Sequence, residues 1–159
     1  MRGKLVGRGR ELDAALRALD ATVCGWGSVF VLAGEAGIGK SRLAEEIAGI
    51  ARNRGMEVVW SGGWPGGGPP PYWPWPEVLG AIESPSDGAP GQSSTYPSSE
   101  RTGWFRSVAA ALRERARRRP LLVVLDDAHT IDPDGLLLTR FVARTIVGHP
   151  VSLLLTHRS

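Results

Sequence analysis

The sequence predicts an α/β protein in which a sheet of parallel strands lies between two layers of helices. Short apolar runs alternate with amphipathic helical patterns along the 159 residues, which is typical of such a sheet. The run 28–33 leads into a glycine-rich loop and then a helical pattern, and the run 121–125 ends in two aspartates. We find no internal repeat, so we expect one domain over residues 1–159.

The composition agrees with a globular domain of this kind. Apolar residues make up 42% and charged residues 22%, which is ordinary for a soluble protein with a core. Cys24 is the only cysteine, so no disulfide can form within the chain and a reducing, cytoplasmic location is expected. No apolar run approaches the roughly 20 residues of a membrane-spanning helix, so no membrane contact is expected. The formal net charge of +3 permits contact with nucleic acid without arguing for it.

The N-terminal third predicts a helix, a strand and a second helix. Leucines recur at helical spacing between positions 12 and 19, and glycines at 25 and 27 end that helix. Residues 29–33 are apolar throughout, as expected of a strand that is buried on both faces. The second helix runs to about Asn53, and Gly55 closes it.

The middle of the chain changes composition without ending the domain. Residues 56–60 predict a second strand, and residues 77–82 predict a short helix. Between them, residues 62–76 are rich in Gly, Pro and Trp and predict no regular element. Residues 83–99 are rich in Ser, Pro and Gly and are expected to be mobile. We treat residues 62–100 as one insert within the domain.

The aromatic side chains in and beside this insert have two interpretations. They could form a surface for a partner, since aromatic residues favour interfaces, or they could fold back over the edge of the sheet as core. We favour packing, because the prolines would rigidify the loop and large aromatic rings seek burial. The residues concerned are Trp60, Trp64, Tyr72, Trp73 and Trp75.

The C-terminal part completes the alternation of strands and helices. Residues 101–119 predict a helix whose end is dense in arginine. That end is either a nucleic-acid patch or a solvated helix terminus, and we favour the second because no aromatic side chains interleave with the arginines. Residues 121–125 give the strongest strand pattern, and residues 151–155 predict the last strand. Between them, Asp132 suits the N-cap of a helix and Pro133 its first turn.

Residues 34–41 follow the pattern G-x-x-x-x-G-K-S and predict a phosphate-binding loop. Its glycines let the backbone curl, and the loop ends at a helix N-terminus, where unpaired N–H groups favour an anion. Lys40 is expected to reach the β- and γ-phosphates, and Ser41 to place its hydroxyl on Mg²⁺. The candidate nucleotide-binding residues here are Gly34, Glu35, Ala36, Gly37, Ile38, Gly39, Lys40, Ser41 and Arg42.

A second half of the site is predicted where the strongest strand ends in two aspartates. The carboxyl ends of parallel strands line up, so Asp126 can lie beside Ser41 and offer Mg²⁺ a hard oxygen ligand. Asp127 could orient or deprotonate an attacking water. Thr156 and Arg158 follow the last strand. These two could contact the γ-phosphate or the water, or they could simply form a polar chain end.

Four motifs of the chain carry a likeness to a known family: Leu5-Val6-Gly7-Arg8 with Glu11-Leu12, Gly34 to Ser41, Leu121 to Asp127 with Ala128-His129, and Thr156-His157-Arg158. Together these motifs resemble the AAA+/STAND-type P-loop ATPase module, and most closely the module of large ATP-binding transcriptional regulators of the LuxR family. The insert is also similar, at residues 70–79, to one seen in many of those modules.

The resemblance implies a three-layer α/β/α P-loop NTPase sheet and assigns roles to individual residues. Val6, Gly7 and Arg8 would lie near the adenine and the ribose. Lys40 and Ser41 would hold phosphate and Mg²⁺, and Asp126 would bind Mg²⁺ through water. Asp127 would act on the hydrolytic water, while Thr156 and Arg158 would sense the γ-phosphate.

The chain departs from that family at two points. Family members commonly carry His-Trp-Ala-Asp after the acid pair, whereas this chain has His129-Thr130-Ile131-Asp132. Family modules also continue into a fifth strand and a helical lid, which are missing here, so the edge of the strand 29–33 would be exposed. We therefore expect a partial module, which is either a fragment or is completed by another chain or by a second copy in a homo-oligomer.

Three functions from different classes remain open on these grounds. The first is an ATP-binding, weakly hydrolysing switch module of a signalling or transcriptional regulator, with ATP and Mg²⁺ as cofactors. The second is a small-molecule phosphotransferase, although the tandem aspartates favour hydrolysis over transfer. The third is an incomplete, non-enzymatic fragment whose insert contacts a partner. DNA contact by this chain itself is not expected, because it has no helix-turn-helix pattern.

Overall fold

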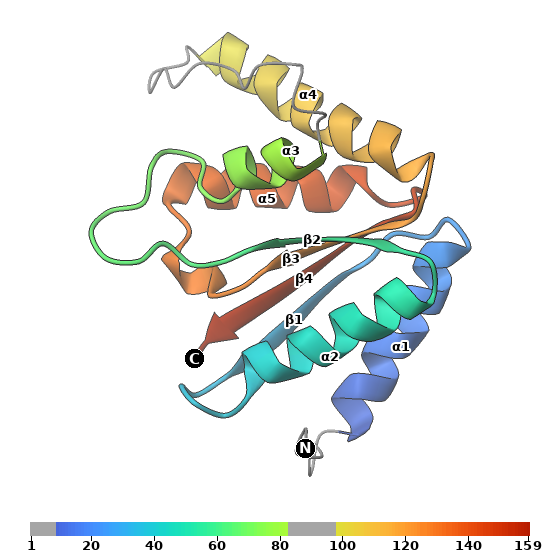
Figure 1. The fold of residues 1–159 in the computed structure, drawn as a ribbon. Helices are drawn as coiled ribbons and strands as arrows, with labels where there is room; N and C mark the ends of the chain where they lie inside the picture. The colour runs from blue at the N-terminus through green and yellow to red at the C-terminus, as the bar shows by residue number, and fades with distance from the viewer. Residues whose placement is uncertain (1–8, 83–97) are drawn as a thin grey trace.

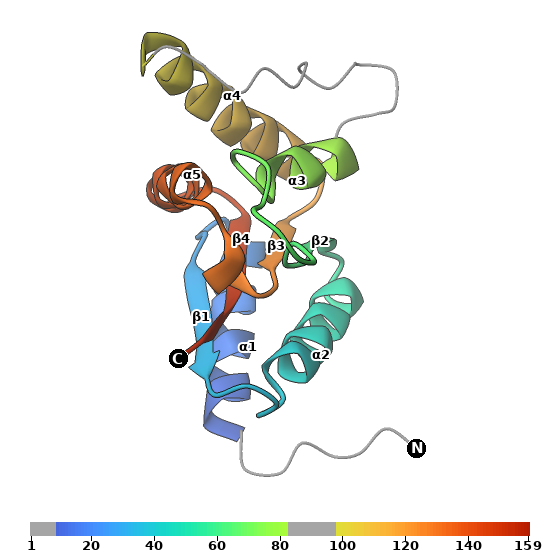
Figure 2. The same ribbon diagram turned by 90° about the vertical axis from the view of Figure 1, so that its left-hand side faces the viewer.

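The computed structural model describes residues 9–82 and 98–159 and has the α/β architecture that the sequence predicts (Figure 1). Four parallel strands form one sheet in the order β1-β4-β3-β2. Helices α1 and α2 cover one face of the sheet, and α3, α4 and α5 lie on the other; Figure 2 shows the same layers from the side. The elements are α1 (Gly9–Val23), β1 (Val29–Gly34), α2 (Lys40–Asn53), β2 (Glu57–Ser61), α3 (Trp75–Ile82), α4 (Ser98–Ala116), β3 (Leu121–Leu125), the short 3₁₀ helix η1 (Ala128–Thr130), α5 (Pro133–Thr145) and β4 (Val151–Arg158).

The central strand β3 separates two hydrophobic cores. Leu122 and Val124 pack with α1 and α2, whereas Leu121, Val123 and Leu125 pack with α3, α4 and α5. Every residue of β3 is buried, which is why its sequence is an unbroken apolar run. The alternation of side chains along a strand places the residue that follows Leu125 on the α2 side of the sheet.

Three hydroxyl groups join α1 to the ladder between β1 and β4. Thr22 Oγ1 donates to Ala18 O at 2.7 Å, so its oxygen accepts the hydrogen of Ser152 Oγ, which lies 2.5 Å away. Ser152 Oγ in turn accepts the Ser28 N–H at 3.1 Å and lies 3.0 Å from Ser28 Oγ. Thr22 and Ser152 are fully buried, and their mutual pairing removes the cost of burying unbonded hydroxyls.

Some element boundaries differ from the sequence predictions. Strand β2 is shifted by one residue from the predicted 56–60. Helix α3 begins at Trp75, inside the stretch predicted to be irregular, because Trp75 is fully buried and Pro76 is compatible with a first helical turn. Strand β4 passes its predicted end at 155 and continues to Arg158, since it pairs with β1 as far as Gly34.

The arginine-rich end of α4 is part of the fold. The helix ends at Ala116 rather than at the predicted 119, and Arg119 Nε donates to Gly55 O at 3.1 Å. Arg115 binds Glu57 through two hydrogen bonds of 2.8 and 3.0 Å. These bonds, and then the charge of Glu57, raise the pKa of Arg115 above its ordinary value. These contacts fasten α4 to the start of β2, which supports the interpretation as a structural helix end rather than a nucleic-acid patch.

The aromatic side chains of the insert pack against the domain. Trp75 is fully buried. Tyr72 and Trp104 have ring centroids 4.6 Å apart, and Trp64 meets Trp73 edge-on at 5.0 Å. Tyr72, Trp64 and Trp73 are half-buried, so the structure agrees with packing, the interpretation favoured above.

Strand β1 lies at an edge of the described sheet, as the exposed edge predicted for residues 29–33 requires. It pairs with β4, and Val29 and Val31 are 42% and 55% exposed. The prediction that this strand is buried on both faces is wrong, because only Leu32 of its residues is buried. None of the described helices combines the length and the apolarity needed to span a membrane.

Part of the predictions falls on residues that the structure does not describe. Val6, Gly7 and Arg8, which the resemblance assigns to the adenine and ribose, are among them, and so are residues 83–97 of the stretch expected to be mobile. Residues 98 and 99, at the end of that stretch, instead form the start of α4.

Candidate functional site

The predicted phosphate loop connects β1 to α2. Gly39 is the N-cap of α2 and has a φ of 89°, a left-handed conformation that glycine adopts without strain. No described side chain caps this end of the helix, so the first N–H groups of α2 are available to an anion. Residues 35–38 are exposed, which gives a ligand access to the loop from solvent.

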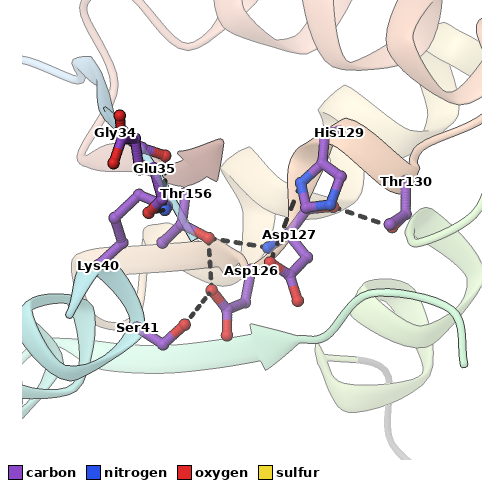
Figure 3. A network of polar contacts seen from close by, with 9 residues as sticks. All are labelled: Gly34, Glu35, Lys40, Ser41, Asp126, Asp127, His129, Thr130 and Thr156. Atoms are coloured by element: carbon purple, nitrogen blue, oxygen red, sulfur yellow. Dashed lines mark hydrogen bonds and ion pairs between the residues drawn. The ribbon is translucent and has the colours of Figure 1, made fainter. Parts of the chain in front are cut away.

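Lys40 lies inside the curve of this loop (Figure 3). Its side chain is mostly buried, and Nζ donates to Gly34 O at 2.7 Å and to Glu35 O at 2.6 Å. An ammonium group is a point charge with three donors, so phosphate oxygens entering the loop would meet it directly. The structure thus places Lys40 at the loop, and its contact with phosphate stays a prediction.

Ser41 and Asp126 meet across the edge of the sheet (Figure 3). Ser41 Oγ donates to Asp126 Oδ1 at 3.0 Å, although 85 positions separate the two residues in the chain. They meet because α2 begins on the side of the sheet to which the residue after Leu125 points. A hydroxyl and a carboxylate are oxygen ligands of the kind that Mg²⁺ binds. The described residues contain no group of three or more His, Cys, Asp and Glu that could hold a metal ion.

Thr156 connects the two aspartates from the neighbouring strand. Its hydroxyl donates to Asp126 Oδ1 at 2.5 Å and accepts the Asp127 N–H at 2.8 Å. Thr156 is fully buried on the α2 side of β4, which places it behind the aspartates. The γ-phosphate-sensing role of Thr156 stays a prediction; the structure shows that its hydroxyl contacts both aspartates.

The chain also matches a known family over nearly all of its length. Residues 4–155 match the family model of the AAA ATPase domain. The chain belongs to this family. The P-loop ATPase module expected from the motifs is thus confirmed at the level of the AAA ATPase domain, while the narrower likeness to LuxR-family regulators stays a prediction.

A curated relative is much longer than this AAA ATPase domain. An uncharacterised protein of Rhizobium meliloti (strain 1021) is 30% identical over an alignment 193 residues long, gaps included, which covers 99% of this chain and 19% of the relative. The chain therefore spans about a fifth of the length of that protein.

Solved AAA structures share the fold at low sequence identity. Cdc6p from Pyrobaculum aerophilum has a TM-score of 0.64 at 16% identity and matches 98% of this chain over 40% of its own. The ORC2 protein of Aeropyrum pernix, solved in ADPNP-ADP complexes, has a TM-score of 0.53 at 21% identity and matches 100% of this chain over 43% of its own. PCH-2 of C. elegans has a TM-score of 0.54 at 10% identity and matches 94% of this chain over 37% of its own.

Asp127 is more exposed than Asp126 in the candidate site of this AAA ATPase domain. Its backbone is left-handed, with φ 55° and ψ 46°, and its carbonyl accepts bonds from the N–H and the hydroxyl of Thr130, both at 2.9 Å. Its side chain is 54% exposed and lies 4.0 Å from His129 Nδ1. We call residues 126–132 the acidic loop. The loop fixes the backbone of Asp127 while its carboxylate faces solvent, where a water molecule could reach it.

The remaining candidate residues lie around this network. Arg158 is exposed and is paired in register with Gly34 at the end of β4, so it is near the phosphate loop, although no described contact joins it to the aspartates. Arg42 is exposed in the first turn of α2. The rings of His129 and His157 lie 6.1 Å apart, and His129 lies beside Asp127; the motifs already place both histidines near the site, as solvated or structural side chains rather than catalysts.

Proposed function

We propose that this AAA ATPase domain binds ATP with Mg²⁺ and hydrolyses it slowly. The observation that carries the proposal is the 3.0 Å contact between Ser41 Oγ and Asp126 Oδ1. This contact joins the start of the helix after the phosphate loop to the aspartates that follow a buried strand. P-loop NTPases hold phosphate and metal at these two places.

The phosphate loop supplies the binding part of this function. The N–H groups at the start of α2 and the ammonium of Lys40 would bind the β- and γ-phosphates in place of the loop carbonyls that Lys40 contacts now. Ser41 and Asp126 would hold Mg²⁺, which neutralises phosphate charge when bound.

The acidic loop supplies the chemical part. Asp127 would orient a water molecule and accept its proton while the water oxygen attacks the γ-phosphorus. The bond from that phosphorus to the bridging oxygen breaks, ADP leaves with the electron pair, and inorganic phosphate is released. Thr156 would keep Asp126 and Asp127 in place during this step.

We also propose that the domain is the switch module of a larger cytoplasmic regulator of the STAND type, like the LuxR-family proteins that its motifs resemble. The length of the Rhizobium meliloti relative supports a role within a longer protein. A second copy or another chain would then complete the site. We expect the mass measured by light scattering to rise when MgATP is added.

Calorimetric titration with MgATP tests the binding proposal. Lys40→Ala should abolish binding, whereas Arg52→Ala should leave it unchanged, because Arg52 is an exposed cation at the far end of the same helix. Circular dichroism verifies that both variants are folded. A folded wild-type chain that does not bind MgATP would contradict the proposal.

A further inference from the structure

Residues 62–74, which we call the aromatic segment, are fastened to both ends of the acidic loop. At one end, the Asp126 N–H donates to Ser61 O at 2.9 Å, directly before the segment begins. At the other end, Asp132 Oδ2 accepts the Tyr72 N–H at 3.1 Å. The same carboxylate oxygen accepts the Gly135 N–H at 3.1 Å as the N-cap of α5. The aromatic segment and the acidic loop are therefore tied together near both of their ends.

Between these ends, the two segments touch at Gly63. A Cβ atom at this position would lie 2.8 Å from Asp127 Cβ and 3.1 Å from Thr130 Oγ1. Side chains practically never approach so closely, so residue 63 can be only glycine unless one of the two segments moves. The neighbouring Gly62 is different, because a Cβ there would meet nothing within 4 Å.

Trp73 holds Gly63 in position against the acidic loop. Its Nε1–H donates to Gly62 O at 3.2 Å, and its ring packs edge-on against that of Trp64. Trp73 therefore contacts the residue before Gly63 and the residue after it. Trp75 anchors the end of the segment in the core, where its Nε1–H donates to Thr139 Oγ1 at 2.9 Å. The part of the aromatic segment that contains Gly63 is thus held by one indole hydrogen bond and one edge-on pair of rings.

We propose that Gly63 and Trp73 are positioning residues for Asp127, so that the aromatic segment sets the rate of hydrolysis. The proposal rests on the proposed function, in which Asp127 acts on the attacking water. The Thr156 hydroxyl accepts the Asp127 N–H, the Asp127 carbonyl accepts the N–H and the hydroxyl of Thr130, and Gly63 lies against Asp127 Cβ. These three contacts fix the backbone and the Cβ of Asp127, and so the point from which its exposed carboxylate extends. A displacement of the segment would therefore move the base without touching the phosphate loop.

The test compares Gly63→Ala with Gly62→Ala, two identical changes at adjacent positions. Three quantities are measured on the 159-residue chain: affinity for MgATP by calorimetry, kcat and KM for phosphate release, and amide hydrogen exchange of residues 126–132 without nucleotide. For Gly63→Ala we expect faster exchange and a kcat lower by about tenfold or more, because small misplacements of reacting groups cost up to about 10²-fold. Affinity and KM should stay within about threefold of wild type, and Gly62→Ala should resemble wild type in all three.

A second pair of variants tests the indole hydrogen bond. Trp73→Phe keeps an aromatic ring and removes the donor to Gly62 O, whereas Trp26→Phe is the same change at a tryptophan that is 65% exposed. We expect Trp73→Phe to lower kcat by about threefold to tenfold with KM unchanged, and Trp26→Phe to have no effect. Urea unfolding shows whether either change acts through stability alone.

The outcomes separate this inference from the proposed function. If the wild-type chain fails to bind MgATP, the proposed function is wrong, yet faster exchange in Gly63→Ala alone would still support the coupling between the segments. If exchange and kcat of Gly63→Ala match those of wild type, the inference is overturned. It is also overturned if both glycine variants lose activity equally, or if Gly63→Ala loses MgATP affinity in parallel with kcat.

Discussion

The phosphate loop and the acidic loop hold the two halves of one site in different ways. The phosphate loop is exposed, and apart from the lysine that occupies it, its shape comes from glycine and from the start of α2. The acidic loop is supported by Thr156 from β4, by its own Thr130 and by the aromatic segment. The contrast indicates that bound phosphate completes the first loop, whereas the second is already formed without a ligand.

This difference has a physical reason. A phosphate brings a large charge and many acceptor oxygens, so the residues that bind it need only to be available. A base that acts on water has no such ligand to order it, and its position must come from the protein itself. Substitutions in the two loops should therefore have different signatures.

The largest expected effect is that of Asp127→Asn on hydrolysis. The amide cannot accept the proton of water, so phosphate release should fall by about 10²-fold or more, while calorimetric affinity for MgATP stays near that of wild type. Asp13→Asn, at an exposed acid of α1, is the matched control. If Asp127→Asn turns over normally, the acidic loop is not the chemical half of the site.

Ser41→Ala should act on the other half and depend on the metal. Without the hydroxyl, Mg²⁺ loses one ligand, so affinity for MgATP should fall by about tenfold, or ~1.4 kcal/mol, while affinity for ATP in EDTA changes little. Ser41→Thr keeps the hydroxyl and should retain binding. An equal loss with and without Mg²⁺ would show that Ser41 does not serve the metal.

Thr156→Val should disturb the acidic loop through its support. Removal of the hydroxyl leaves the Asp127 N–H without its partner, so urea unfolding should show a loss of about 1–3 kcal/mol. Hydrolysis should fall as well, with MgATP affinity retained, and Thr156→Ser should restore both properties. A stable Thr156→Val with full activity would mean that the loop is held without this strand.

The smallest effect is expected from Arg115→Ala. In its ion pair with Glu57, the side chains of Arg115 and Glu57 are 34% and 20% exposed. The pair lies where β2 begins, at the opposite end of that strand from the acidic loop. The stability loss should stay at or below about 1 kcal/mol, and phosphate release should be unchanged. A clear change in turnover would show that the arginine-rich end of α4 communicates with the site.

The parts of the fold that local patterns determine were predictable from the sequence. The buried strand 121–125, the loop 34–41 and the N-cap at Asp132 are each specified by neighbouring residues, and the structure contains all three. The contact of Ser41 with Asp126 was also predictable, because parallel strands end at a common edge.

Contacts between distant segments were not predictable in the same way. The sequence identifies Asp132 as a helix cap, but nothing near it shows that the same oxygen also binds the Tyr72 N–H, 60 positions away. Gly63 could be seen only as one of many glycines in a turn. Its close approach to Asp127 depends on how two loops pack, and a single sequence carries no signal for that distance.

The linked hydroxyls of Thr22, Ser28 and Ser152, of which the first and the last are fully buried, favour one alignment of β4 with β1 over all others. A slip of β4 by one residue would bring Val151 or Leu153 beneath Thr22 and leave polar groups buried without partners. Apolar strands alone would tolerate several alignments at similar energy, because one leucine replaces another. Three small polar side chains therefore disfavour misaligned states of the strand pair that brings Thr156 to the aspartates and Arg158 beside Gly34 of the phosphate loop.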